Sequence, residues 1–143
     1  MRIKYDDSDK WFSLCVRERS DWTCERCGKK FIPPAQSLHC SHLMSRRHRA
    51  LRWHPDNACA HCFGCHRYLG ENPIEFSEWI NQRFGQERVI FLIDRAAQVL
   101  KVTETERKDI AVHYRKEHEK IIEKRAKAKT GRIEFTAWDG YKT

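Results

Sequence analysis

The amino-acid sequence predicts an α+β fold with a small zinc-stabilised core, several surrounding α-helices and a long C-terminal helix. Two cysteine pairs with the spacing of metal-binding knuckles lie within residues 24–65. Short strand-like segments separate these pairs, and helical periodicity with capping residues follows them. We therefore expect residues 1–100 to form the zinc-knuckled core with its flanking helices. Residues 101–143 are expected to add a C-terminal helix and a basic tail to the same domain.

The first half of the chain is expected to contain one helix and two strands. The helix begins at Ser8, and a tight knuckle around TCERCGKKFIPP follows it. Its apolar face consists of Trp11, Phe12, Leu14, Cys15 and Val16. Residues 36–44 suit a short strand, and a second short strand lies near Asn57. The segment SRRHRALRWHPDN between the strands is expected to be an exposed basic loop.

The second half of the chain is expected to be helical. Asn72 caps a helix, and Glu75 completes a capping box. A further helix covers residues 87–100, and a second capping box of Thr103 and Glu106 opens the long helix. The residues expected to face inward are Phe76, Trp79, Ile80, Phe84, Val89, Leu92, Ile93, Ala96, Leu100, Ile110, Tyr114, Ile121 and Ile122. The last ten residues add a strand or stay loosely attached.

The composition limits the kinds of partner that the chain can have. It has 28 Lys and Arg against 20 Asp and Glu, a formal charge of +8, and a basic chain of this size often binds nucleic acid. It has no apolar run long enough to cross a bilayer, and its first ten residues are too charged for a secretory signal. We expect a cytoplasmic protein with no membrane partner. Thiols stay reduced there, so the seven cysteines favour a metal over disulfides.

The cysteine pairs predict one structural zinc ion. Cys24 and Cys27 form one pair with two residues between them, and Cys62 and Cys65 form another. Each pair can place two thiolates on one tetrahedral ion, and a site with four thiolates is closed to substrate. Cys59 and Cys62 have the same spacing, so the spacing alone leaves the second pair open.

The zinc leaves several histidines unexplained. His39 and His42 lie in the first predicted strand, Asn57 precedes the second cysteine pair, and His66 directly follows Cys65. Two strands followed by a helix, with a histidine on the first strand and another at the helix start, is the layout of the ββα-metal nucleases. The order His42, Asn57, His66 resembles HNH nucleases of the zinc-knuckled kind related to phage endonuclease VII.

Four segments resemble a more particular family. DWTCERCG, HCSHLMSR, CFGCH and GENPIEF are similar, in order and spacing, to the NinG (Rap) family of phage recombination endonucleases. The resemblance covers roughly residues 21–85 and implies an HNH-like nuclease core within residues 1–100. It also implies a phage- or prophage-encoded protein that acts in a bacterial host cell. The spacing of the family pattern favours Cys62 and Cys65 as the second pair over Cys59.

The resemblance implies a metal-dependent endonuclease that hydrolyses phosphodiester bonds in branched DNA, such as Holliday junctions and D-loops. His42 is then the general base that deprotonates the attacking water, because neutral imidazole suits this role near pH 7. Asn57 fixes the hairpin or orients His42. His66 binds a divalent cation that stabilises the leaving oxygen.

The ligands of this second metal differ from those of endonuclease VII-like sites, which usually have a carboxylate directly before the catalytic histidine. Ser41 holds that position here. We expect His39 to replace the carboxylate as the partner of His66, with Asp56 as the alternative. Two imidazoles make a softer site, so manganese, cobalt or nickel should support more activity than magnesium. No small-molecule cofactor is expected.

The expected partner is DNA, and four arginines after the first strand are expected to bind its phosphates. They are Arg46, Arg47, Arg49 and Arg52. A homodimer would supply two cuts in a branched substrate. The rival interpretation is a non-catalytic zinc-finger DNA-binding protein, which requires the knuckles and the basic loop but does not require His42 as a base.

Overall fold

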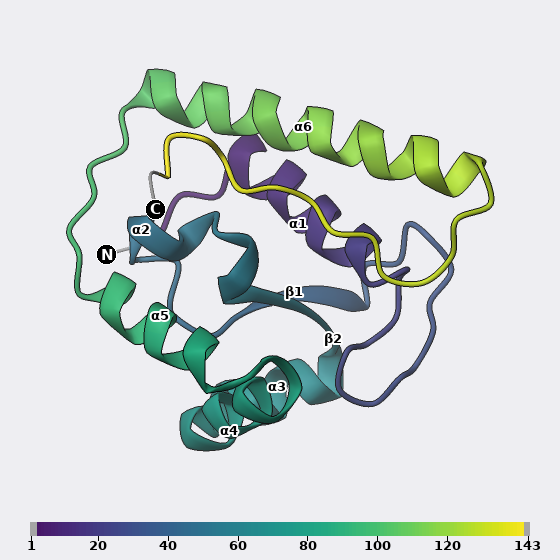
Figure 1. Ribbon diagram of the computed structural model, residues 1–143, viewed down its shortest axis with the longest axis horizontal. Coiled ribbons are helices and arrows are strands. Elements are labelled where there is room, and N and C mark those ends of the chain that lie inside the picture. The colour runs from purple at the N-terminus through teal and green to yellow at the C-terminus, as the bar shows by residue number, and fades with distance from the viewer. Residues whose placement is uncertain (1–2, 142–143) are drawn as a thin grey trace.

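The computed structural model describes residues 3–141 and has an α+β architecture (Figure 1). The strands are β1 (Leu38–His42) and β2 (Ala58–Cys62). The helices are α1 (Asp7–Arg19), α2 (Arg49–Arg52), α3 (Phe63–Glu71), α4 (Pro73–Phe84), α5 (Gln86–Ala96), α6 (Glu104–Ala126) and the short 3-10 helix η1 (Pro55–Asn57). The two-stranded sheet lies between α1 and α3, and α6 packs along the other side of α1 (Figure 1).

The register of the sheet decides which way each histidine faces. The strands are antiparallel, with His39 opposite His61 and His42 opposite Ala58. Neighbours along a strand point to opposite faces of the sheet. His39 therefore faces α3, where its ring meets the ring of His66, whereas His42 faces α1 and the ring of Phe12.

Capping residues set the starts of two helices. Asp6 caps α1 and shares a capping box with Asp9, so the helix begins one residue before the expected Ser8. The expected capping box of Thr103 and Glu106 opens α6 and is confirmed.

Other helix predictions were wrong at particular residues. Asn72 precedes α4 but makes no capping bond, because its side-chain amide donates to the carbonyl of Tyr68. Glu75 instead accepts from the Tyr68 hydroxyl, so the predicted capping box does not form. Helix α5 ends at Ala96 rather than at residue 100, and Ile93 on this helix is exposed. Ile122 on α6 is exposed as well.

The main core lies between α1, the sheet, α6 and the C-terminal segment. Its largest buried members include Phe12, Trp53, Ile110, Tyr114, Ile121 and Ile133. A smaller core under α3 and α4 contains Cys59, Leu69, Phe76 and Ile80. Residues 132–141 form no strand, yet they run back along α1 and α6 and bury several aromatic rings (Figure 1). The expected strand or loose tail is thus a packed, irregular segment.

The segment between the strands is not the exposed loop that its charges suggested. It contains α2 and η1, and Ala50–Pro55 are all buried. The Trp53 carbonyl accepts from the Tyr114 hydroxyl, and the Trp53 amide donates to the Tyr141 hydroxyl. Partners from α6 and the C-terminal segment therefore hold this segment inside the fold. Among the described residues, no helix is both long and apolar enough to cross a membrane.

Candidate active site

Four cysteines form a cluster that can hold a zinc ion. The sulfur atoms of Cys24, Cys27, Cys62 and Cys65 all lie within 4.8 Å of one another. The sulfurs of Cys27 and Cys62 are 3.8 Å apart. Ligands at about 2.3 Å from a tetrahedral zinc ion are separated by about 3.8 Å, so the donor set and its spacing both fit zinc.

The backbone of each knuckle supports its thiolates. The Cys27 amide lies 3.5 Å from the Cys24 sulfur, and the Cys65 amide lies 3.5 Å from the Cys62 sulfur. Gly28, at φ +80°, allows the first knuckle to turn. Burial raises the pKa of Cys24, but hydrogen bonds from backbone amides outweigh this effect and lower the pKa to about 7. The backbone of the first knuckle thus favours deprotonated Cys24, which is the form that binds zinc, whereas burial raises the pKa of Cys65 to about 12.

The remaining cysteines lie outside this cluster. Cys59 is buried in the smaller core, so Cys65 completes the set and the ambiguity of spacing is resolved. Burial raises the pKa of Cys40 to about 12 and also raises the pKa values of Cys15 and Cys59. These three thiols are therefore inert structural residues.

A cavity of about 570 Å³ lies beside the first strand, and three of the predicted histidines line it. They are His39, His42 and His66. The Nδ1 atoms of His39 and His66 are 3.0 Å apart. This is a hydrogen-bond distance, and it is also the separation of two octahedral ligands that each lie about 2.1 Å from an ion. The pair can thus share a metal ion, although no third histidine, cysteine or carboxylate group completes a compact cluster with them in residues 3–141.

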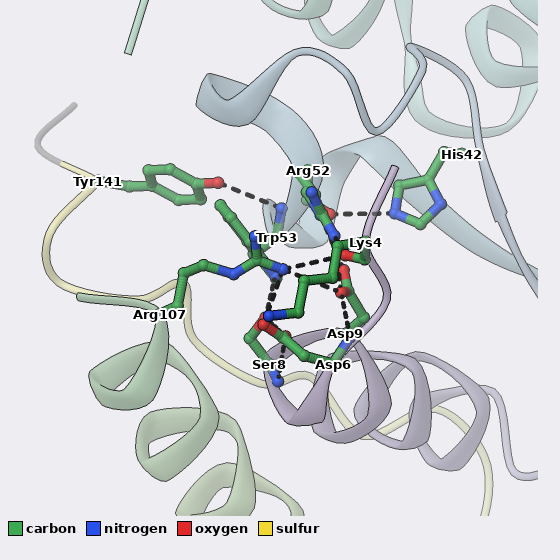
Figure 2. Close-up of polar contacts among 9 residues, drawn as sticks. All are labelled: Lys4, Asp6, Ser8, Asp9, His42, Arg52, Trp53, Arg107 and Tyr141. Atoms are coloured by element: carbon green, nitrogen blue, oxygen red, sulfur yellow. Dashed lines mark hydrogen bonds and ion pairs between the residues drawn. The ribbon is translucent and has the colours of Figure 1, made fainter. Parts of the chain in front are cut away.

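The hydrogen bonding of His42 fixes its tautomer. Its Nε2 lies 3.0 Å from the carbonyl oxygen of Arg52, which can only accept, so Nε2 carries the proton (Figure 2). Nδ1 is then the unprotonated atom, and it points away from Arg52. Burial lowers the pKa of His42 to about 4. The ring is therefore neutral at pH 7, which a general base requires.

Asn57 is buried and holds the loop that follows β1. Its side-chain oxygen accepts from the Met44 amide at 2.8 Å, and its amide nitrogen donates to the carbonyls of Met44 and Leu51 at 2.9 and 3.2 Å. The side chain thus contacts Met44 and Leu51 rather than His42. It fixes the backbone just beyond His42, at the C-terminal end of the first strand.

Neither Ser41, which holds the position of the missing carboxylate, nor Asp56, the alternative ligand, is placed to bind a metal with His66. The Ser41 hydroxyl is fully buried and has no hydrogen-bond partner in the described part of the chain. Asp56 forms an ion pair with Arg88 at 3.2 Å. The expectation that His39 partners His66 therefore has the better geometry.

The four arginines predicted to bind DNA differ in their surroundings. Arg46 lines the cavity, and Arg47 and Arg49 are exposed next to it in an adjoining groove of about 450 Å³. Arg52 was wrongly assigned, because it is 3% exposed and its guanidinium is held by Asp9. Its charge is neutralised inside the fold and is not available to a phosphate group.

Arg52 belongs to a buried network that connects three parts of the chain (Figure 2). Its guanidinium donates to both oxygens of Asp9, at 2.9 and 2.8 Å, and to the carbonyl of Lys4. Arg107 from α6 donates to the same carbonyl and pairs with Asp6 at 2.8 Å. The N-terminus of α1 thus holds two arginines, and the backbone carbonyl of one of them, Arg52, accepts the hydrogen bond from His42.

Sequence reasoning missed several cavity residues, among them an arginine and a tyrosine. Arg17, on α1, and Tyr5, just before this helix, both line the cavity with the histidines. Arg17 falls three residues after the apolar Leu14 of α1, a spacing that places it near one edge of the helix face. No local signal in the sequence marks Tyr5.

The fold and the site define a small α+β protein with a four-cysteine cluster that can hold a metal ion and a nearby cavity lined by histidines. More particularly, the chain belongs to the NinG family, since the family model described as Bacteriophage Lambda NinG protein matches residues 4–125. The match includes both knuckles and all three cavity histidines. No curated protein and no solved structure matches the chain.

Proposed function

We propose that this protein is a metal-dependent endonuclease that hydrolyses phosphodiester bonds in DNA. The observation that carries the proposal is the cavity that places His42 together with the His39–His66 pair. A neutral imidazole and a pair of metal-binding nitrogens beside the same space are what this hydrolysis needs.

The chain's own residues have distinct parts in the proposed reaction. His42 accepts a proton at Nδ1 from the attacking water, while the Arg52 carbonyl keeps Nε2 protonated and the ring oriented. Arg17 and Arg46 attract the phosphate that is to be cleaved. His39 and His66 would hold a divalent ion, which would supply Lewis-acid stabilisation of the leaving oxygen. The zinc cluster holds the fold and takes no part in the chemistry.

The proposal includes an HNH-like, ββα-metal core formed by β1, β2 and α3. Its support is the order of the elements, with His42 at the end of β1 and His66 in the first turn of α3. Branched DNA is the proposed substrate, cut by a homodimer in the cytoplasm of a phage-infected or lysogenic bacterium. The exposed Arg47 and Arg49 extend the basic surface beyond the cavity, which suits a substrate with more than one DNA arm.

A cleavage assay tests the proposal. Labelled linear duplex, flap and four-way-junction DNA are incubated with zinc-loaded protein and with manganese, magnesium or no added divalent ion. Wild type is compared with His42→Ala and with the control His113→Ala. His113 lies on α6, forms a hydrogen bond with the Thr136 carbonyl and does not line the cavity. We expect cleavage of branched DNA, faster with manganese than with magnesium, that only His42→Ala abolishes.

Two other results would change the assignment. DNA binding without cleavage under every metal condition would favour the non-catalytic zinc-finger binder, with the buried Ser41 in place of a carboxylate as the mark of an inactive site. Equal or greater activity with magnesium would contradict a site built on two imidazoles.

A further inference from the structure

An exposed aromatic ring stands at the edge of the cavity. Tyr5 lines the cavity together with the three histidines, yet 55% of the residue is exposed. The guanidinium of Arg46 lies over the Tyr5 ring, 5.6 Å from its centre. Burial of the phenol, aided by Asp9, raises the pKa of Tyr5, and Arg17 and Arg46 oppose this shift. The hydroxyl end therefore lies among the charged groups of the cavity, while part of the ring stays open to solvent.

The size of the cavity limits what can enter it. A volume of 570 Å³ corresponds to a cube about 8 Å wide, whereas the major groove of a DNA duplex is already about 12 Å wide. Pockets of about 300–1,000 Å³ accept small organic molecules, the size class of a single nucleotide. One nucleotide fits this space and a base-paired duplex does not.

The adjoining groove provides a path for the rest of the strand. It shares Ile3 and Arg46 with the cavity, so the two hollows lie next to each other. Its lining contains six basic side chains and the single acid Glu104. Lys4, Arg47 and Arg49 are exposed there, while Arg52 and Arg107 are held by Asp6 and Asp9. A phosphate backbone that leaves the cavity past Arg46 therefore meets further positive charge.

We propose that the cavity binds one unpaired nucleotide of a DNA strand, with its base stacked on Tyr5 and its neighbouring phosphate held by Arg46. Aromatic rings bind unpaired bases by stacking, and nearby arginines add charge attraction to the backbone. The inference rests on the proposed function, because it assumes that the cavity receives DNA. It predicts that a fully paired duplex binds more weakly, because its bases cannot reach the ring.

Equilibrium binding tests this stacking site without any cleavage. Zinc-loaded protein is titrated, with no other divalent ion, into three labelled DNAs, and fluorescence anisotropy is recorded. The first is a duplex with one unpaired nucleotide, the second has an abasic sugar at that position, and the third is fully paired. The variants are Tyr5→Ala, Tyr5→Phe and the control Tyr68→Ala. Tyr68 is also exposed, has Arg26 over its ring at 4.7 Å, and does not line the cavity.

The expected result is a loss confined to one variant and one DNA. Tyr5→Ala should bind the DNA with the unpaired nucleotide about 5- to 150-fold more weakly than wild type, the effect of losing one stacked base. Tyr5→Phe and Tyr68→Ala should bind it as wild type does. Wild type should bind the abasic and fully paired DNAs about as weakly as Tyr5→Ala binds the DNA with the unpaired nucleotide.

Other results would overturn the inference. Equal binding of the abasic and unpaired DNAs, equal losses in Tyr5→Ala and Tyr68→Ala, or a loss in Tyr5→Phe as large as in Tyr5→Ala would each exclude stacking on the ring. Failure to bind any of the DNAs would reject both proposals. Because no cleavage is needed, selective binding without nuclease activity would support this site and reject only the proposed reaction.

Discussion

Replacing Asp9 by asparagine tests the buried network that supports His42. Asp9 and Arg52 are 4% and 3% exposed, and two hydrogen bonds of 2.9 and 2.8 Å join them. Arg107 lies 3.7 Å from the same carboxylate (Figure 2). Asparagine has nearly the same shape but no charge, so Arg52 would lose its counter-ion in a place that water does not reach.

The loss of stability should be large. Removing one partner of a buried ion pair costs about 3–5 kcal/mol, because the other charge remains buried without compensation. For a chain of this size each kcal/mol corresponds to about 2–4 °C, so the midpoint of thermal unfolding should fall by about 6–20 °C. The displaced Arg52 carbonyl would also release His42, and cleavage should fall even at temperatures at which the variant is folded.

Urea unfolding of zinc-loaded protein, followed by tryptophan fluorescence, measures the effect. The control is Glu71→Gln, which removes the ion pair with Arg67 on the surface of α3, where both side chains are more than half exposed. A pair of this kind contributes about 0–1 kcal/mol, so the control should stay close to wild type. A loss below about 1 kcal/mol in Asp9→Asn would refute the reasoning, since the pair would then behave as a surface pair.

Three further predictions concern the metal cluster, the buried histidines and the loop. Cys65→Ser should lose the bound zinc in a metal analysis, whereas Cys59→Ser should keep it; zinc loss in Cys59→Ser would reject the assigned cluster. Burial lowers the pKa values of His42 and His54 to about 4, so between about pH 6.5 and 4 the unfolded chain binds protons that the folded chain does not. Their stability contribution is therefore complete above about pH 6.5 and lost as the pH falls toward 4, by up to about 1.4 kcal/mol per pH unit for each histidine. Urea midpoints that stay constant over this range would contradict it. Asn57→Ala should lower the free energy of unfolding in urea by about 2–3 kcal/mol, because the substitution removes three hydrogen bonds inside the protein, and a loss under about 0.5 kcal/mol would show that the loop does not depend on them.

Features that depend on neighbouring residues could be predicted from the sequence. The Cys24–Cys27 and Cys62–Cys65 pairs combine into the predicted cluster. Each knuckle is defined by four consecutive residues and supplies two ligands, so a zinc ion with four ligands requires both knuckles. The capping box that opens α6 is likewise a local exchange of hydrogen bonds.

Features that depend on distant partners were missed. The residues around Arg52 have the composition of a surface loop. Arg52 is buried because its charge is paired with Asp9, which lies 43 residues away in the sequence. Tyr141 forms part of the same region by donating its hydroxyl to the Arg49 carbonyl, 92 residues away. Hydrophobic periodicity carries no information about such contacts, so the buried loop and the packed C-terminal segment could not be predicted.

The four-cysteine cluster has a consequence for the entropy of the chain. A zinc ion held there closes a loop of about 40 residues, and such a closure reduces the conformational entropy of the unfolded chain by an amount equivalent to about 4 kcal/mol. His39, His42 and Asn57 all lie inside this loop and make no direct contribution to the zinc site. Their arrangement would then depend on an ion that none of them touches, so removal of zinc would disrupt the cavity without altering a single residue in it.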